Sequence, residues 1–286
     1  MPSPFPTTSR GWVGAGLFAA ALMGAVFTAA PEAASARELR VCADPNNLPY
    51  SKKDGSGFEN EIAEIIADEL GAKLSYYWFP ERRTFLRNTI KAGHCDVVMG
   101  IPSAMKMLLT TRPYYRSSYA FVQREGEAPV TSFDDPKLRK MKIGVQLLGE
   151  DGVNSPPVEI LARRGIVGNV EGYMVYGDYG SDAPLSPIMD AVADGDVDVA
   201  IVWGPIAGYF ASREDPPLQL TPVLFDPSQI LMQMTYDMSI GVRKGDTALA
   251  GDIGDALRAR RDEIDAVLAR YGVPRVDKPT KLGEAR

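Results

Sequence analysis

Residue types that carry out nucleophilic, acid–base or metal chemistry are scarce in this sequence. It has two cysteines, Cys42 and Cys95, and a single histidine, His94. Adjacent residues on a strand point to opposite faces, so His94 and Cys95 are poorly placed to act as a catalytic pair. His94 also lacks the ligand spacing of a zinc site, and no glycine-rich phosphate loop or calcium loop is present. We therefore predict that the protein is not an enzyme and has no metal site and no cofactor.

Polar and aromatic residues that could bind a small molecule follow the predicted strands, where the ligand clefts of α/β proteins form. The first half of the chain contributes Asp44, Asn46, Asn47, Tyr50, Glu81, Arg82, Arg83 and Ser103. The second half contributes Gln146, Tyr176, Asp178, Tyr179 and Trp203. This mixture is typical of a binding cleft. The alternative is structural: Asp44, Asn46 and Asn47 make a turn, Glu81 to Arg83 form a solvated helix start, and Tyr176 and Tyr179 fill surface.

A second candidate site is a surface for a protein partner. The run from Arg112 to Arg116 combines arginine and tyrosine, which are frequent anchors of protein interfaces. It predicts an exposed contact patch made by Arg112, Tyr114, Tyr115 and Arg116. The alternative is that the two tyrosines pack inside the protein, against the segments that join its halves.

The first 36 residues have the pattern of a secretory signal. Arg10 supplies a positive charge, an uncharged apolar stretch runs from residue 12 to residue 30, and Ala34-Ser35-Ala36 offers a cleavage site. We predict cleavage after Ala36, a periplasmic location and no membrane contact of the mature chain. The alternative is an uncleaved membrane anchor, because the apolar stretch is long enough to span a bilayer.

Export bears on the two cysteines, because disulfides form in oxidising compartments. Cys42 and Cys95 allow one intramolecular pairing, and both lie at or beside predicted strands of the same half. This favours a disulfide over the alternative of two buried thiols.

The formal net charge of −6 excludes nucleic acid as a partner, since phosphate binding needs clustered lysine and arginine.

Strand and helix patterns alternate along the rest of the chain. Strands are predicted at residues 39–43, 73–79, 96–100, 119–122, 142–145, 170–176, 197–203 and 238–243. Helices are predicted at residues 57–70, 81–92, 158–164, 188–193 and 247–271. Strands separated by helices indicate parallel pairing with right-handed crossovers.

These elements predict an α/β protein with two lobes and a two-strand hinge. The chain leaves the first lobe near Tyr119 and returns near Met238, and two such crossing strands would form the hinge. We place lobe 1 at residues 37–122 and 236–275, lobe 2 at 123–235 and a flexible tail at 276–286.

The order of elements resembles the type II periplasmic solute-binding fold. Four segments resemble the amino-acid-receptor branch of this fold. They are Gly57-Phe58-Glu59, Asp96–Gly100, Thr111–Tyr115 and Ile240–Asp246. Longer runs resemble the quinoprotein dehydrogenase-associated binding proteins of the MxaJ and XoxJ type. They are Leu39–Tyr50, Arg82–Thr89, Cys95–Pro102 and Leu109–Ser118. This resemblance implies an accessory of methanol oxidation that interacts with or helps activate a PQQ-dependent methanol dehydrogenase, with its cytochrome c as a further candidate partner.

One departure from the amino-acid receptors narrows the ligand class. In that branch an arginine a few residues past the third strand clamps the ligand carboxylate with a bidentate pair. Residues 102–108 contain no arginine, and Lys106 is the one basic residue there that could replace it. A free amino acid is thus a poor ligand candidate. The alternative function is a solute-binding receptor of an ABC transporter for a small non-amino-acid ligand, because the lobes of this fold usually close on a ligand.

Overall fold

The computed structural model describes residues 37–148, 154–223 and 232–276. The predicted signal peptide lies outside these ranges, and so does the predicted tail apart from Val276. Within them, no helix combines the length and the apolar character that crossing a bilayer requires.

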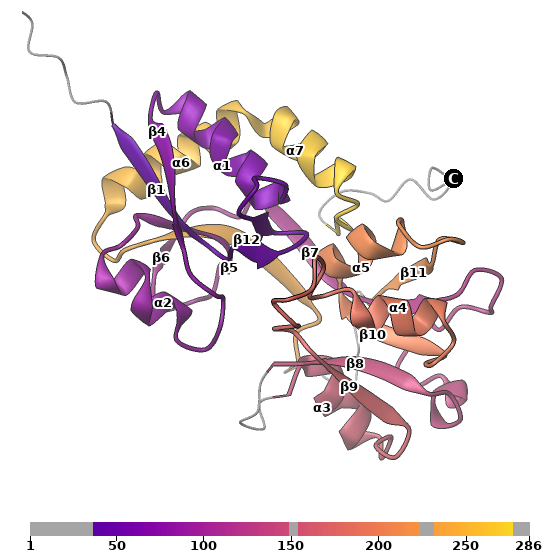
Figure 1. The fold of residues 1–286 in the computed structure, drawn as a ribbon. Helices are drawn as coiled ribbons and strands as arrows, with labels where there is room; N and C mark the ends of the chain where they lie inside the picture. Colours follow the sequence, from indigo (N-terminus) through magenta and orange to yellow (C-terminus); the bar gives the residue numbers. More distant parts are fainter. Residues whose placement is uncertain (1–36, 149–153, 224–231, 277–286) are drawn as a thin grey trace, which may run out of the picture. The chain divides into compact units, whose positions relative to one another are not determined.

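The first lobe is built on mainly parallel strands. Its strands are β1 (Glu38–Ala43), β4 (Lys73–Trp78), β5 (Val97–Pro102), β6 (Leu109–Thr110) and β12 (Thr235–Val242), with the β2 (Asn46–Asn47) and β3 (Ser51–Lys52) hairpin beside them. Its helices are α1 (Phe58–Glu69), α2 (Phe85–Asn88), η1 (Ile90–Ala92), α6 (Thr247–Ala259) and α7 (Arg261–Arg270). β1 pairs in parallel with β4 and β5, and β12 is antiparallel to β5. Figure 1 shows α1, α6 and α7 grouped together beside these strands.

The second lobe repeats this plan with shorter helices. Its strands are β8 (Ile143–Leu147), β9 (Val170–Met174), β10 (Val199–Trp203) and β11 (Gln219–Pro222). Its helices are η2 (Pro136–Arg139), α3 (Pro156–Arg163), α4 (Pro187–Ala193) and α5 (Gly204–Ala211). β8 pairs in parallel with both β9 and β10.

Two long strands join the lobes. β7 (Tyr115–Gln123) pairs along its first half with β12 and along its second half with β10, so one sheet runs in the order β4-β1-β5-β12-β7-β10-β8-β9. The predicted fold class is thereby confirmed, with β7 and β12 as the two crossing strands. The residue bounds assigned to each lobe remain a prediction.

The side chains of β7 and β10 are divided between two cores by the two-residue period of a strand. Ala120 and Val122 pack with α4 and α5, whereas Tyr119 and Phe121 pack on the opposite face with α3. All four are less than a tenth exposed. This alternation explains why the central strands read as continuous apolar runs in the sequence.

Three helix predictions need correction. The long helix expected at 247–271 is interrupted at Arg260, whose φ of −104° and ψ of 26° separate α6 from α7. The helix expected at 81–92 is confined to α2 and η1. The backbone N–H of Glu81 donates to Asp44, which holds the residues before α2 in a loop. α5 was not predicted, since its two glycines and one proline lower the helix propensity of a segment that packing stabilises.

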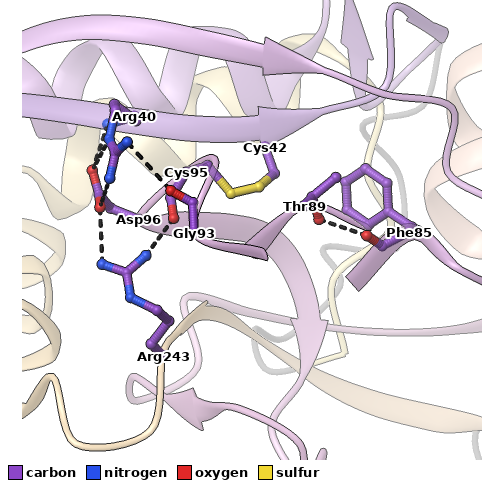
Figure 2. Close-up of a disulfide and its surroundings, with 8 residues drawn as sticks. All are labelled: Arg40, Cys42, Phe85, Thr89, Gly93, Cys95, Asp96 and Arg243. Carbon is purple, nitrogen blue, oxygen red and sulfur yellow. Dashed lines mark hydrogen bonds and ion pairs between the residues drawn. A yellow bond between two sulfur atoms is a disulfide. The ribbon is translucent and has the colours of Figure 1, made fainter. Parts of the chain in front are cut away.

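The predicted disulfide is present in lobe 1. Cys42 lies in β1 and Cys95 two residues before β5, with their Cα atoms 5.5 Å apart and both residues buried. Figure 2 shows Asp96 beside the bridge, held between Arg40 and Arg243. Its carboxylate accepts from Arg40 Nε at 3.0 Å and Nη2 at 2.8 Å, and from Arg243 Nη2 at 3.0 Å. Partial burial opposes ionisation of Asp96, but these donors outweigh it and lower the pKa of the carboxyl.

Replacing Asp96 with asparagine should remove both ion pairs. We expect Asp96→Asn to lose about 2 kcal/mol of unfolding free energy at pH 7, less than for a fully buried pair because both arginines are partly exposed. Because the pKa is lowered in the folded state, this stability is present above the unfolded pKa and is lost as the pH falls through the folded one. Urea unfolding at pH 7 and pH 3 measures it.

The matched control is Asp255→Asn, which removes an exposed ion pair with Arg258 on α6. Such a pair contributes about 0.5 kcal/mol or less, so the control should change little. Equal losses in the two variants, or a loss for Asp96→Asn that persists unchanged at pH 3, would contradict the proposed role of Asp96.

Candidate functional site

A cleft of about 600 Å³ lies between the two lobes. Most of the sequence candidates line it: Asp44, Asn46, Asn47, Tyr50, Glu81, Arg82, Arg83, Gln146, Tyr176, Tyr179 and Trp203. Their common position at the carboxyl ends of parallel strands brings them together, as α/β topology requires. Asp44 follows β1, Glu81 follows β4, Tyr176 follows β9, and Trp203 ends β10. Whether each contacts a ligand remains a prediction.

Two of the candidates do not line this cleft. The Ser103 hydroxyl lies 3.0 Å from the carbonyl oxygen of Asp237 and 2.6 Å from Ser239 Oγ, so Ser103 fastens the end of β5 to β12. Asp178 lines a separate pocket of about 350 Å³ in lobe 2, and its carboxylate accepts from the backbone N–H of Gly180. Lys106 is exposed and is absent from the cleft lining, so it does not take the place of the missing arginine.

The sequence prediction missed several residues of the cleft. Tyr119 and Tyr236 lie on the hinge strands β7 and β12, which could have been expected to form the floor between two lobes. Glu59 belongs to the first turn of α1 and lines the cleft, whereas the sequence pattern predicts only a helix start there. It faces Gly100, where a Cβ atom would lie 2.1 Å from Glu59 Oε1, so the glycine makes room for the carboxylate. This proximity has no signal in the sequence.

A set of contacts joins the lobes at one side of the cleft. Tyr179 of lobe 2 donates its hydroxyl to the Asp44 carboxylate, which also accepts from the backbone N–H groups of Asn46 at 2.8 Å and Glu81 at 2.5 Å. Asn46 donates its amide to the carbonyl of Ser181 at 2.8 Å. We call Asp44, Asn46, Tyr179 and Ser181 the interlobe latch. Its contacts show that the lobes are in direct contact while a cleft remains between them.

Next to the latch, the Arg82 guanidinium stands over the rings of two lobe 2 tyrosines. Its carbon lies 5.7 Å from the ring centre of Tyr176 and 5.1 Å from that of Tyr179. These are cation–π distances, and they place a positive charge over rings that the sequence prediction had assigned to the cleft.

Two carboxyl groups of the cleft hold protons more tightly than usual. Desolvation beside the cleft walls raises the pKa of Glu81 to about 7, with repulsion from Asp44 adding to the shift and a hydrogen bond from Asn47 opposing it. Enclosure likewise raises the pKa of Glu59 well above its ordinary range, and the charge of Glu81 raises it further. Glu81 therefore changes charge near neutral pH.

The raised pKa of Glu81 predicts a specific pH dependence of stability. A folded-state pKa above the unfolded value means that the folded protein binds the proton more tightly, so stability is full below about pH 4.5 and is lost as the pH rises toward 7. Relative to Glu81→Gln, wild-type protein should lose unfolding free energy between pH 4.5 and pH 7 and little above that. Urea unfolding across this range checks it, and parallel curves for the two proteins would contradict it.

The predicted partner patch is wrong for its two tyrosines. Tyr114 and Tyr115 are each 1% exposed, and Tyr115 packs edge-on against Phe58 of α1 at 6.1 Å between ring centres. Their position where β7 begins beside β12 turns both rings into the lobe 1 core. Arg112 and Arg116 are exposed, and Arg116 forms an ion pair with Asp237 at 3.1 Å.

Comparison with known proteins places this fold and cleft in a family. The bacterial extracellular solute-binding proteins, family 3, match residues 39–273. The chain belongs to this family. Protein MoxJ of Paracoccus denitrificans, which is similar over nearly its whole length, is 34% identical over 280 residues that cover 91% of this chain and 95% of MoxJ.

Two solved structures are similar to this chain in sequence and shape. The periplasmic binding protein XoxJ from Methylobacterium extorquens AM1 is 36% identical, with a TM-score of 0.69 over 84% of this chain and all of XoxJ. MxaJ from Methylophaga aminisulfidivorans is 25% identical, with a TM-score of 0.70 over 83% of this chain and all of MxaJ. The resemblance to MxaJ- and XoxJ-type proteins is therefore confirmed.

Proposed function

We propose that this protein is a non-enzymatic periplasmic accessory of a methanol oxidation system, which interacts with or helps activate a PQQ-dependent methanol dehydrogenase. The observation that carries the proposal is its similarity to MoxJ, XoxJ and MxaJ across both lobes. The signal-like first 36 residues support the periplasmic location. The lack of an arginine in residues 102–108 separates the protein from receptors that clamp an amino-acid carboxylate.

The exposed arginines Arg112 and Arg116 are the proposed contacts to the dehydrogenase or its cytochrome c. Both are exposed and lie close together in the chain, and arginine is a frequent interface anchor.

The test is association of the mature protein with purified methanol dehydrogenase, measured by pull-down and by titration. Wild-type protein should be retained by the dehydrogenase, and Arg112→Ala/Arg116→Ala should bind at least tenfold more weakly. Arg258→Ala, an exposed arginine on α6, is the matched control and should bind as wild type does. Absence of association, together with unchanged dehydrogenase activity in a deletion strain, would refute the accessory role.

A second candidate function is a solute-binding receptor of an ABC transporter, and the cleft itself favours it. A cavity of about 600 Å³ is in the range of small-molecule sites. A thermal-shift screen of small solutes tests this function, since a ligand at 100 times its dissociation constant adds about 2.7 kcal/mol of stability. A screen without any shift would argue against the receptor and leave the accessory role standing.

A further inference from the structure

Three carboxyl groups line the cleft, which four basic residues line as well. Asp44, Glu59 and Glu81 form no ion pair in the part of the chain that the structure describes. Asp44 is 2% exposed, and Glu59 has no hydrogen-bond partner among the described side chains. Desolvating a carboxylate without a counter-charge costs free energy, which a positively charged ligand would recover.

Aromatic rings line the same cleft. The ring of Trp203 lies edge-on to Tyr119 at 5.4 Å and to Tyr236 at 5.6 Å between ring centres, and Tyr50 lines the same cleft. Rings of this kind attract cations through their electron-rich faces, and groups of them recognise alkylated ammonium ions. These rings therefore favour a positively charged ligand independently of the carboxyl groups.

A buried amide offers one further contact. Gln146 lines the cleft and is 4% exposed, and its Oε1 accepts from the backbone N–H of Trp203 at 2.8 Å. That bond leaves the amide NH₂ as a donor without a partner among the described residues. It can donate to a neutral oxygen of the ligand, such as a hydroxyl group.

The basic residues that line the cleft lie at exposed positions. Arg82, Arg83, Arg87 and Lys91 are all exposed, and Arg82 stands over the rings of Tyr176 and Tyr179. Glu81 is exposed as well, whereas Asp44 is buried and Glu59 is half-buried, so solvent and salt screen the four basic groups more strongly than they screen Asp44 and Glu59. A carboxylate on the ligand would be repelled by the less exposed Asp44 and Glu59, and residues 102–108 contain no arginine to clamp it.

We infer that the cleft binds a small organic ammonium cation that carries no carboxylate, with the rings of Trp203, Tyr119 and Tyr236 and the carboxylates of Glu59 and Glu81 around its positive charge. This inference names the ligand class of the cleft and rests on the second candidate function, the binding of a small solute.

Calorimetry with matched compounds tests the inference on the mature protein at pH 7.5. Choline is compared with glycine betaine, which replaces its hydroxymethyl group with a carboxylate, and with 3,3-dimethylbutan-1-ol, which replaces its nitrogen with carbon. Agmatine is compared with arginine, which adds a carboxylate. We expect choline or agmatine to bind at least tenfold more tightly than its matched counterparts.

Two variants assign the effect to the cleft. Glu59→Gln and Glu81→Gln should each weaken binding of the preferred cation at least tenfold, whereas Glu64→Gln, at an exposed position of α1, should leave it unchanged. Cation binding should also release protons near pH 7, measured as a dependence of the apparent enthalpy on the ionisation enthalpy of the buffer.

Several outcomes would overturn the inference. One is that neither choline nor agmatine binds. Another is that the carboxylate-bearing counterpart or the neutral alcohol binds as tightly as the cation it is matched with. A third is that Glu59→Gln and Glu81→Gln both retain cation binding. The accessory role fails separately, through loss of association with the dehydrogenase. A wild-type protein that associates with the dehydrogenase but binds no cation refutes this inference alone.

Discussion

The double variant Cys42→Ser/Cys95→Ser is expected to lose about 4 kcal/mol of unfolding free energy, because the bridge closes a loop of 53 residues that is far less constrained in the unfolded chain without it. The bridge also holds β1 against the start of β5, and both positions are buried, so each serine hydroxyl would enter an apolar cluster with Phe85 and Ile90. The melting temperature should fall by roughly 8–16 °C for a domain of this size.

The control for this prediction uses reductant. Dithiothreitol should lower the stability of wild-type protein toward that of the double serine variant and leave the variant itself unchanged. A single variant, Cys42→Ser, should behave like the double one, because the remaining cysteine has no partner in the chain. Wild-type protein that keeps its full stability under reduction would show that the buried packing, rather than the covalent link, stabilises this region.

Replacing Asp44 with alanine should produce the second large loss, about 3 kcal/mol of unfolding free energy. The Asp44 side chain accepts three hydrogen bonds at 2% exposure, two from backbone N–H groups and one from the Tyr179 hydroxyl. Alanine leaves the N–H groups of Asn46 and Glu81 without their acceptor. The loss follows because a partly buried donor left without its acceptor costs more than the bond itself contributes.

Two further variants divide this effect between the turn and the latch. Tyr179→Phe removes only the interlobe bond and should lose about 1 kcal/mol. Asp54→Ala removes a carboxylate that serves an exposed turn through Ser56, and should change stability little. Urea unfolding measures all three. If Tyr179→Phe lost as much as Asp44→Ala, the interlobe bond and not the loop after β1 would be the main role of Asp44.

The latch and the carboxyl groups of the cleft are connected through Asp44. Its carboxylate holds the N–H of Glu81 and, through repulsion, contributes to the raised pKa of that residue. A ligand cation beside Glu81 would lower this pKa again, so ligand binding, proton release and the contact between the lobes are expected to be coupled.

Much of the fold was predictable because it depends on local patterns. The apolar spacing of α1, the apolar runs of β5 and β10, and the alternation of strands with helices each follow from side-chain burial at a fixed period. Strand order in an α/β fold then places the residues after each strand at one edge, which is why Asp44, Glu81 and Trp203 could be expected in one cleft. The pairing of Cys42 with Cys95 was predictable because two cysteines allow one intramolecular pairing and both lie at or beside strands of the same lobe.

Other features depended on contacts between residues far apart in the chain. Glu59 faces Gly100, Tyr179 donates to Asp44, and the rings of Tyr114 and Tyr115 turn inward where β7 meets β12. None of these contacts has a local signature. The residues next to a tyrosine or a glutamate in the chain do not show which distant segment its side chain will meet. Patterns of burial along the chain therefore specified the two lobes, whereas the charge balance of the cleft and the contact between the lobes arose only when distant segments came together.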